Sequence, residues 1–336
     1  MHFAGRREAE YSMQHGGKAI VRTLALVRAR PYNWQTFLEA ATKAVMARSI
    51  RSDMGYLVRR IAIHAVLLAG CVVFSMPFVW LISASFKGPT EIFAVPMQWI
   101  PEVFQERPIR WSEVFQNFRS AQEFVPFWLW MRNTFYVTGL NVLFTVLVSS
   151  FVAYGFSRIR WRGRDTVFIF VLATLMLPPQ VTMIPTFLIF NKLGWYNTLQ
   201  PLWVNALFGH AFSIFLLRQF MMTLPGDLED AAKIDGCGHF RIYSTITLPL
   251  IKPALAVVAV QAFQHAWNNF LGAYIYINTK DKMTIALGLQ WFQSEHMSMY
   301  GEMMATSLVM TLPMIVIFFL CQRYMIQGIS LSGIKG

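Results

Sequence analysis

The residues best placed to do chemistry in this sequence lie in one polar segment, residues 220–252. This segment reads FMMTLPGDLEDAAKIDGCGHFRIYSTITLPLIK. Pro225 can open a helix, because the N–H that proline lacks has no intrahelical acceptor in the first turn. Three carboxylates then fall in the first turns, where the helix dipole favours negative charge: Asp227, Glu229 and Asp230. The segment therefore offers carboxylates for ion pairing at the start of a short helix.

The same segment is typical of two short helices joined by a turn. Lys233 lies four residues after Glu229, which favours an ion pair between them. Gly236 is a natural helix stop, and a second short helix is expected over about 239–247. A segment that only connects two helices needs a few residues, and this segment is much longer. Its small pair Ala231–Ala232 allows another protein to approach closely. The segment therefore predicts a helix–turn–helix elbow that serves as a docking surface.

Other kinds of chemistry find no support in the sequence. Gly17-Lys18-Ala19 lacks both the upstream glycine and the following Ser or Thr of a phosphate-binding P-loop. The three cysteines form no CxxC pair and predict neither a metal site nor a disulfide framework. No nucleophile–base motif and no metal-ligand cluster is present, so we expect no catalytic residue.

The composition of the chain indicates what kind of helices flank and position this polar segment. Of the 336 residues, 55% are hydrophobic and only 14% are charged, whereas soluble domains are about a quarter charged. A helix needs about 20 apolar residues to cross a bilayer. Six stretches of at least that length contain no Asp, Glu, Lys or Arg: 61–86, 133–157, 166–191, 193–217, 253–279 and 303–322. The sequence therefore predicts an all-α membrane protein with six transmembrane helices and excludes a soluble enzyme, a disordered chain and a secreted disulfide scaffold.

The six helices are expected over 61–84, 127–157, 166–190, 199–219, 253–277 and 301–322. Prolines 178, 179 and 185 must kink the third of them. Residues 59–336 then form the transmembrane domain, and residues 1–58 a basic cytoplasmic extension. Within that extension, 18–30 fits a basic amphipathic helix on the membrane surface. The alternative is that translation begins at Met54, so that the protein lacks this extension.

The distribution of charge predicts the orientation. The net charge is +12. With the N-terminus inside and six alternating helices, the inside segments hold 21 Lys and Arg residues and the outside segments hold 8. This asymmetry follows the positive-inside rule. The basic residues therefore predict cytoplasmic termini and contact with anionic lipid, and nucleic-acid binding is disfavoured.

Polar side chains within the expected spans are candidates for a translocation path, because such groups are costly in lipid and usually face the bundle interior. Interhelical hydrogen bonding and solvation of helix ends are the alternative roles. His210 and Ser213 belong to the same group of polar residues. The principal candidates are Gln180, Asn205, Gln261, Gln264, His265, Asn268 and Asn269.

The polar segment also resembles a known family. Asp230-Ala231-Ala232, then three residues, Gly236, nine residues and Ile246-x-Leu248-Pro249 resemble the cytoplasmic EAA loop of ABC importer permeases. The family's leading Glu is Asp230 here, which keeps the charge on a shorter arm. Over about 61–336 the chain resembles the maltose-type carbohydrate importers in further motifs: Ala153-Tyr154-Gly155-Phe156-Ser157-Arg158, Leu177-Pro178-Pro179-Gln180-Val181, Leu193-Gly194-Trp195-Tyr196-Asn197-Thr198 and Trp267-Asn268-Asn269-Phe270.

This resemblance implies a permease subunit in the inner membrane of a prokaryote. Its expected partners are a second permease subunit, two cytoplasmic ABC ATPases and an external solute-binding protein. ATP and Mg²⁺ are expected on the ATPases, with no cofactor or metal in this chain. The tail residues Gly333 and Lys335 are further candidates for ATPase contact. The residues that the resemblance assigns to ATPase docking are Asp230, Ala231, Ala232, Asp235, Gly236, Leu248 and Pro249.

The solute remains open at this point. A sugar or oligosaccharide fits the resemblance, and a polyol, a sugar phosphate or a peptide fits the same architecture. A secondary transporter would need acidic residues or repeats within the membrane for ion coupling. None of the six expected spans holds an Asp or Glu in its interior. A membrane enzyme lacks any supporting motif.

Overall fold

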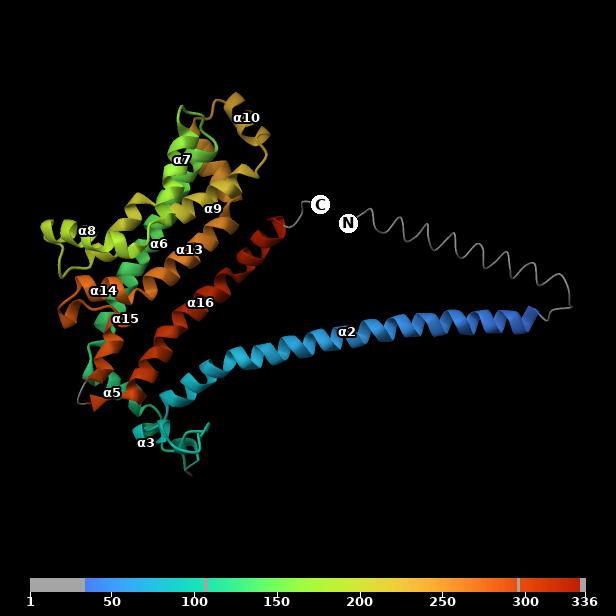
Figure 1. Ribbon diagram of the computed structural model, residues 1–336, viewed down its shortest axis with the longest axis horizontal. Helices are drawn as coiled ribbons and strands as arrows, with labels where there is room; N and C mark the ends of the chain where they lie inside the picture. Colours follow the sequence, from blue (N-terminus) through green and yellow to red (C-terminus); the bar gives the residue numbers. More distant parts are fainter. Residues whose placement is uncertain (1–33, 106–107, 295–296, 333–336) are drawn as a thin grey trace. The chain divides into compact units, whose positions relative to one another are not determined.

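A computed structural model describes residues 34–105, 108–294 and 297–332 (Figure 1). The described residues divide into two units, 34–77 and 78–332. Helix α2, Trp34–Ser85, contains the boundary between them. No proline interrupts the sequence from residue 34 to 76, so the helix begins well before the expected residue 61. The segment 18–30 lies outside the described residues.

Short helices follow α2 and form the first long loop. One side chain joins the later part of this loop to its beginning: Asn117 donates hydrogen bonds to the carbonyl oxygens of Ser85 (3.0 Å) and Lys87 (2.8 Å). The elements of this loop are α3 (Pro89–Ile92), η2 (Glu102–Phe104), α4 (Trp111–Val114) and α5 (Gln116–Phe124).

Helix α6, Phe127–Ser157, is the central element of the second unit, and its bounds equal the expected ones. Its 31 residues include a single charged side chain, Arg132, and the small residues Ser149, Ser150 and Ala153 are buried against its neighbours. Helices α9 (Ala211–Met222) and α13 (Lys252–Trp267) make the most extensive contacts with it. Figure 1 shows these three helices running together.

The expected third helix is broken rather than kinked. Helix α7 (Arg164–Ala173) continues through η3 (Thr174–Met176) and stops, and α8 (Pro179–Lys192) leaves at 98°. Leu177 is extended, because Pro178 disfavours the helical conformation in the residue before it. Pro179 then suits the first turn of α8. Two consecutive prolines thus end one helix and start another.

The helix expected over 199–219 is not continuous in the structure. Only α9 is α-helical there, and two 3₁₀ turns precede it: η4 (Gln200–Leu202) and η5 (Val204–Phe208). Gly209 separates the turns from α9 with a φ of 75°, which an L side chain rarely adopts. A Cβ at this position would also lie 3.2 Å from Ile214 Cδ1.

The expected helix over 253–277 divides into α13 and α14 (Phe270–Tyr276). Asn269 causes the second helix to start afresh, because its side-chain oxygen accepts a hydrogen bond from the Gly272 N–H at 2.9 Å. Helix α16 (Tyr300–Ser332) extends beyond the expected 301–322. The connection between α14 and α16 holds η7 (Lys280–Lys282), α15 (Ile285–Gly288), η8 (Leu289–Phe292) and one pair of two-residue antiparallel strands, β1 (Gln293–Ser294) and β2 (Met297–Ser298).

Three of the described helices contain stretches long and apolar enough to cross a membrane: Tyr56–Ser85, Phe127–Ser157 and Tyr300–Tyr324. Three bent pairs pass the same criterion when each pair is taken together. The second unit has two apolar cores. One surrounds Trp130 near the start of α6, and the other surrounds Leu217 near its end. We name them the Trp130 cluster and the Leu217 cluster.

Gly288 permits the packing of the Trp130 cluster. Trp130 is fully buried, and its indole N–H donates to the Lys280 carbonyl at 2.6 Å. A Cβ on Gly288 would lie 2.1 Å from ring atom Cε3 of Trp130. We expect Gly288→Ala to destabilise the protein by about 1–3 kcal/mol, because the ring cannot move without disturbing the core. Thermal denaturation of the detergent-purified protein measures the loss.

Gly139→Ala on α6 is the matched control, because nothing lies within 4 Å of the added methyl group. We expect its melting temperature to equal that of the wild type or to exceed it slightly. Equal melting temperatures for the two variants would contradict the packing described for Gly288.

Candidate functional site: the elbow of residues 220–252

The predicted elbow is a helix, a tight turn and a second helix. Helix α10, Asp227–Ile234, begins after Pro225 and Gly226, with its carboxylates in the first turn. At its end Gly236 has a φ of 76°, and its N–H donates to the Lys233 carbonyl at 3.0 Å. The Cys237 N–H donates to the Ala232 carbonyl at 2.9 Å. These are the two hydrogen bonds of a glycine-terminated helix.

The second part of the elbow is continuous. It runs through α11 (His239–Ile242), a π-helical turn η6 (Tyr243–Thr247) and α12 (Leu248–Leu250). The buried Tyr243 hydroxyl lies 2.7 Å from Ser150 Oγ of α6. Ala232, Ile242 and Tyr243 all belong to the Leu217 cluster. The elbow is therefore packed into the same apolar core as α6, α9 and α13.

Helix α10 has an inner and an outer face. Glu229 and Ala232 are each only 7% exposed and point into the protein. Asp230, Ala231 and Asp235, which the resemblance assigns to docking, are exposed. Ala232 is a correction: it packs in the Leu217 cluster and is not part of the exposed face.

The outer face is apolar at its end. Ile234 is 87% exposed and Phe240, across the turn, is 72% exposed. Leu228 is also exposed. Among the remaining docking candidates, Pro249 is exposed and Leu248 is half-buried. The elbow thus presents apolar side chains beside the carboxylates of Asp230 and Asp235.

A buried arginine fastens α10 to the ends of α6 and α9. Arg158, just after α6, places its Nε 3.2 Å from Glu229 Oε1, with side chains only 11% and 9% exposed. Its Nη2 also donates to the carbonyl oxygens of Met221 and of Leu224, the latter at 3.0 Å. One guanidinium therefore joins the end of α6, the end of α9 and the inner face of α10.

The expected Glu229–Lys233 pair is not formed, because Glu229 turns inward to Arg158. Lys233 instead donates to Asp230 Oδ1 at 2.9 Å. This hydrogen bond lowers the pKa of the Asp230 carboxyl below its ordinary value, and the Lys233 charge adds to the effect. Asp230 therefore remains ionised near neutral pH, on an exposed surface.

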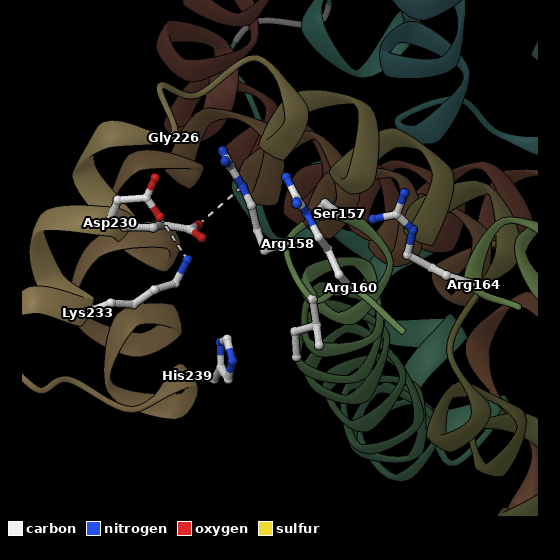
Figure 2. A pocket seen from close by; sticks show the side chains of 10 residues that line it. Ser157, Arg158, Arg160, Arg164, Gly226, Asp230, Lys233 and His239 are labelled. Atoms are coloured by element: carbon white, nitrogen blue, oxygen red, sulfur yellow. Dashed lines mark hydrogen bonds and ion pairs between the residues drawn. The ribbon is translucent and has the colours of Figure 1, made fainter. Parts of the chain in front are cut away.

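A polar cavity of about 700 Å³ lies between α10 and the connector after α6 (Figure 2). Arg158, Arg160 and Arg164 lie on the connector side, and Lys233 and His239 lie on the elbow side. The dashed lines in Figure 2 mark the two ion pairs, Arg158 with Glu229 and Lys233 with Asp230. These pairs offset much of the positive charge at the cavity.

A second arginine secures the start of α7. Arg218 of α9 donates from Nε to the Phe156 carbonyl at 3.2 Å, and its Nη2 lies 3.6 Å from Asp165 Oδ1. Its guanidinium also lies 4.2 Å from the centre of the Phe168 ring. Together with Arg158, this residue holds the connector and α9 in a fixed relation.

The candidates for the translocation path divide into two groups. Gln261 and His265 line a cavity of about 200 Å³ together with His210 and Ser213. The other five are not among the residues that line it. Asn269 caps α14, and Asn268 donates to the Gln264 carbonyl at 3.0 Å.

The remaining predicted residues lie apart from this cavity. Gln180 is exposed in the first turn of α8, and Asn205 is exposed in η5. Gly333 and Lys335 lie outside the described residues, so their expected role stays a prediction.

Sequence reasoning missed several residues of these sites. It named Arg158 only as the last residue of the motif at 153–158, did not single out Ile234 or Phe240, and overlooked Asn141 and Thr145, which line the smaller cavity. Helical spacing could have found Ile234, since it lies four residues after Asp230 and so on the same face of the helix. No sequence signal pairs Arg158 with Glu229, because they lie 71 positions apart in the chain.

Comparisons with known proteins agree with this architecture. Residues 145–329 match the family model "Binding-protein-dependent transport system inner membrane component". The arabinooligosaccharides transport system permease protein AraQ of Halalkalibacterium halodurans is 31% identical over 260 residues, 77% of this chain and 91% of that protein. The trehalose/maltose transport system permease protein MalG of Thermococcus litoralis is 30% identical over 279 residues, covering 82% and 95%.

A solved structure shares the fold. It is the crystal structure of a bacterial ABC transporter involved in the import of the acidic polysaccharide alginate, with a TM-score of 0.66 and 20% identity over 88% of this chain and 100% of that chain. The family match, the two relatives and the shared fold establish one conclusion. The chain belongs to the family of binding-protein-dependent transport system inner membrane components, the permease subunits of ABC transporters.

Proposed function

We propose that this chain is a permease subunit of an ATP-driven importer for a sugar or oligosaccharide. The names of the similar permeases support this substrate class: one transports arabinooligosaccharides and another trehalose or maltose. The family's dependence on a binding protein supports delivery of the solute by an external protein. A second permease subunit and two cytoplasmic ATPases complete the proposed assembly.

In the proposed topology, six spans cross the inner membrane and both termini are cytoplasmic. The three long apolar helices supply three of the spans, and the other three are α7 with α8, Val204–Met222, and Lys252–Trp267, taken from the three bent pairs without the elbow helices. The excess of basic residues on one side supports the orientation. The elbow then lies on the cytoplasmic side, where ATPases hold ATP and Mg²⁺. This chain carries no cofactor in the proposal and does not hydrolyse ATP.

The elbow is the proposed coupling element. ATPase closure displaces α10, and the Arg158–Glu229 ion pair passes this displacement to the ends of α6 and α9. The Leu217 cluster supports the same movement, because well-packed cores move as units rather than deform. The observation that carries the proposal is that one face of α10 is fastened inside the protein while the other is exposed, with apolar and acidic side chains.

Co-purification tests the assembly. The chain is expressed with the permease, ATPase and binding-protein genes of its own transporter. We expect the tagged chain to retain the ATPase and the second permease through size-exclusion chromatography in detergent. Purification of the chain without an ATPase, under conditions that keep the second permease bound, would contradict the proposed docking role of the elbow.

A permease of the same architecture for another solute, such as a polyol, a sugar phosphate or a peptide, is the second candidate. The two candidates differ only in solute. Binding measurements on the external binding protein separate them, because that protein selects what reaches the permease.

A further inference from the structure

The loop that follows α2 carries an exposed apolar surface. No Asp, Glu, Lys or Arg occurs from residue 92 to residue 101. Val95 is 96% exposed, and four other large apolar side chains of this stretch are exposed as well: Phe93, Met97, Trp99 and Ile100. They lie outside both apolar cores of the second unit. We name these five residues the Val95 patch.

The patch is part of a folded loop that is held against the end of α2. The Lys87 side chain is fully buried, and its ammonium group donates to the Gln98 carbonyl. The same ammonium lies 4.0 Å from the centre of the Trp80 ring. The Ser83 hydroxyl donates to the Trp99 carbonyl. These contacts return the far end of the loop to the last turns of α2, so the position of the patch is fixed.

Two ring contacts place the patch near the ends of two candidate membrane spans. The Trp99 ring packs edge-on against Trp80, with ring centres 5.6 Å apart. Trp80 lies about 7.5 Å along the helix before Ser85, where the apolar stretch of α2 ends. The Phe93 ring lies 4.9 Å from the ring of Tyr300, the first residue of the apolar stretch in α16. Both ends of the patch therefore lie close to the depth at which lipid meets water.

Lipid is the partner that this surface fits best. An exposed apolar patch of this kind marks contact with either a protein or a membrane. Tryptophan and tyrosine are typical of the membrane–water interface, and both lie at this loop. A soluble binding protein leaves the permease in every transport cycle, and a patch that only it covered would then return to water. Lipid covers the patch continuously.

We propose that the Val95 patch inserts into the membrane surface and anchors the loop after α2 at the boundary between lipid headgroups and acyl chains. Side chains in this position reach about 5–10 Å into that boundary. In the proposed topology the anchor lies in the outer leaflet. It holds the end of α2 and the start of α16 at a fixed depth. The inference uses the proposed membrane topology and is independent of the solute.

Fluorescence quenching in lipid nanodiscs tests the anchor. The complete transporter is prepared with Cys71, Cys237 and Cys321 replaced by alanine, and Val95→Cys is labelled with an environment-sensitive nitrobenzoxadiazole dye. We expect blue-shifted emission, weak quenching by aqueous iodide and strong quenching by lipids that carry a nitroxide. A nitroxide near the headgroup should quench more than one near the end of the acyl chain, because the insertion is shallow.

Gln116→Cys in the same background is the matched control. Gln116 is exposed on α5, on the same helix face as the exposed side chains of Arg119 and Glu123. Its label should be quenched by iodide and not by the lipid nitroxides. The same complex without an introduced cysteine gives the background from dye on other subunits. ATP-driven uptake and ATPase retention by the labelled Val95→Cys transporter show that it is assembled.

The quenching pattern distinguishes lipid from other partners. A Val95→Cys label that iodide quenches until the binding protein is added would overturn the anchor and identify a binding-protein contact. A label shielded from both iodide and the lipid nitroxides would also overturn it, because another subunit would then cover the patch. Either result, with ATP-driven uptake retained, would leave the proposed import function standing. Loss of ATP dependence in the wild type would count against that function and leave the quenching result unaffected.

Discussion

Replacing Ile234 with aspartate is expected to release the ATPase and abolish ATP-driven uptake. Ile234 ends α10 and is 87% exposed, beside the carboxylates of Asp230 and Asp235. In the proposed complex this side chain is buried against the ATPase. A carboxylate there would be desolvated without a partner and would add to the negative charge already present. We expect a loss of at least about 2 kcal/mol of docking energy, which is a roughly 30-fold weaker association.

Co-purification and uptake are measured together for this variant. Ile234→Leu is the conservative control and should keep both, because it keeps the apolar contact. Val95→Asp makes the same kind of substitution at another exposed apolar residue, in the loop that follows α2. It should leave ATPase association unchanged. Retention of the ATPase by Ile234→Asp at the wild-type level would place the docking surface elsewhere.

Replacing Arg158 with alanine is expected to have the second large effect. The substitution leaves Glu229 charged and buried without its partner, and two carbonyl oxygens lose a donor. Breaking a buried ion pair in this way costs about 3–5 kcal/mol. We therefore expect a marked fall in the melting temperature of the purified complex. Uptake should fall as well, because α10 is no longer fastened to α6 and α9.

Two further variants identify the ion pair as the cause. Arg158→Ala combined with Glu229→Gln should recover part of the lost stability, since the buried charge is then gone. Arg160→Ala removes an exposed arginine from the same connector and should change stability by no more than about 0.5 kcal/mol. Equal melting temperatures for Arg158→Ala and Arg160→Ala would contradict the anchoring role.

The sequence predicted the elements that depend on local chemistry. Helix α6 has the expected bounds, because a long apolar run without proline can only be a helix in lipid. The elbow also has its expected parts, because proline, acidic residues and glycine mark helix ends through local hydrogen bonding. These signals lie within a few residues of the structure they determine.

The breaks in the other spans were harder to predict. The hydropathy of the sequence is continuously apolar across Pro178–Pro179, Gly209 and Asn269, although one helix or turn ends and another begins at each of these positions. Prolines suggested a kink, but the size of the bend depends on what the freed backbone groups can bond to. From the sequence, Asn269 could equally have lined a path or capped a helix. In the structure it caps α14, because its side-chain oxygen accepts a hydrogen bond from the Gly272 N–H.

The functional faces depend on tertiary packing. Ala232 and Ala231 are neighbours of the same type in the same motif, yet one is buried and the other exposed. Glu229 had a favourable partner four residues away in Lys233. It pairs with the buried Arg158 instead, because the attraction between the two charges is stronger where they are shielded from water. Neither outcome follows from the spacing of residues along the chain.

The most direct test of the coupling role is the ATP dependence of solute uptake by proteoliposomes that hold the complete transporter. We expect the wild type to accumulate its sugar only with ATP and the loaded binding protein, and Ile234→Asp to show no ATP-driven uptake at an equal amount of permease. Uptake that proceeds equally without ATP, or by this chain reconstituted alone, would contradict the account.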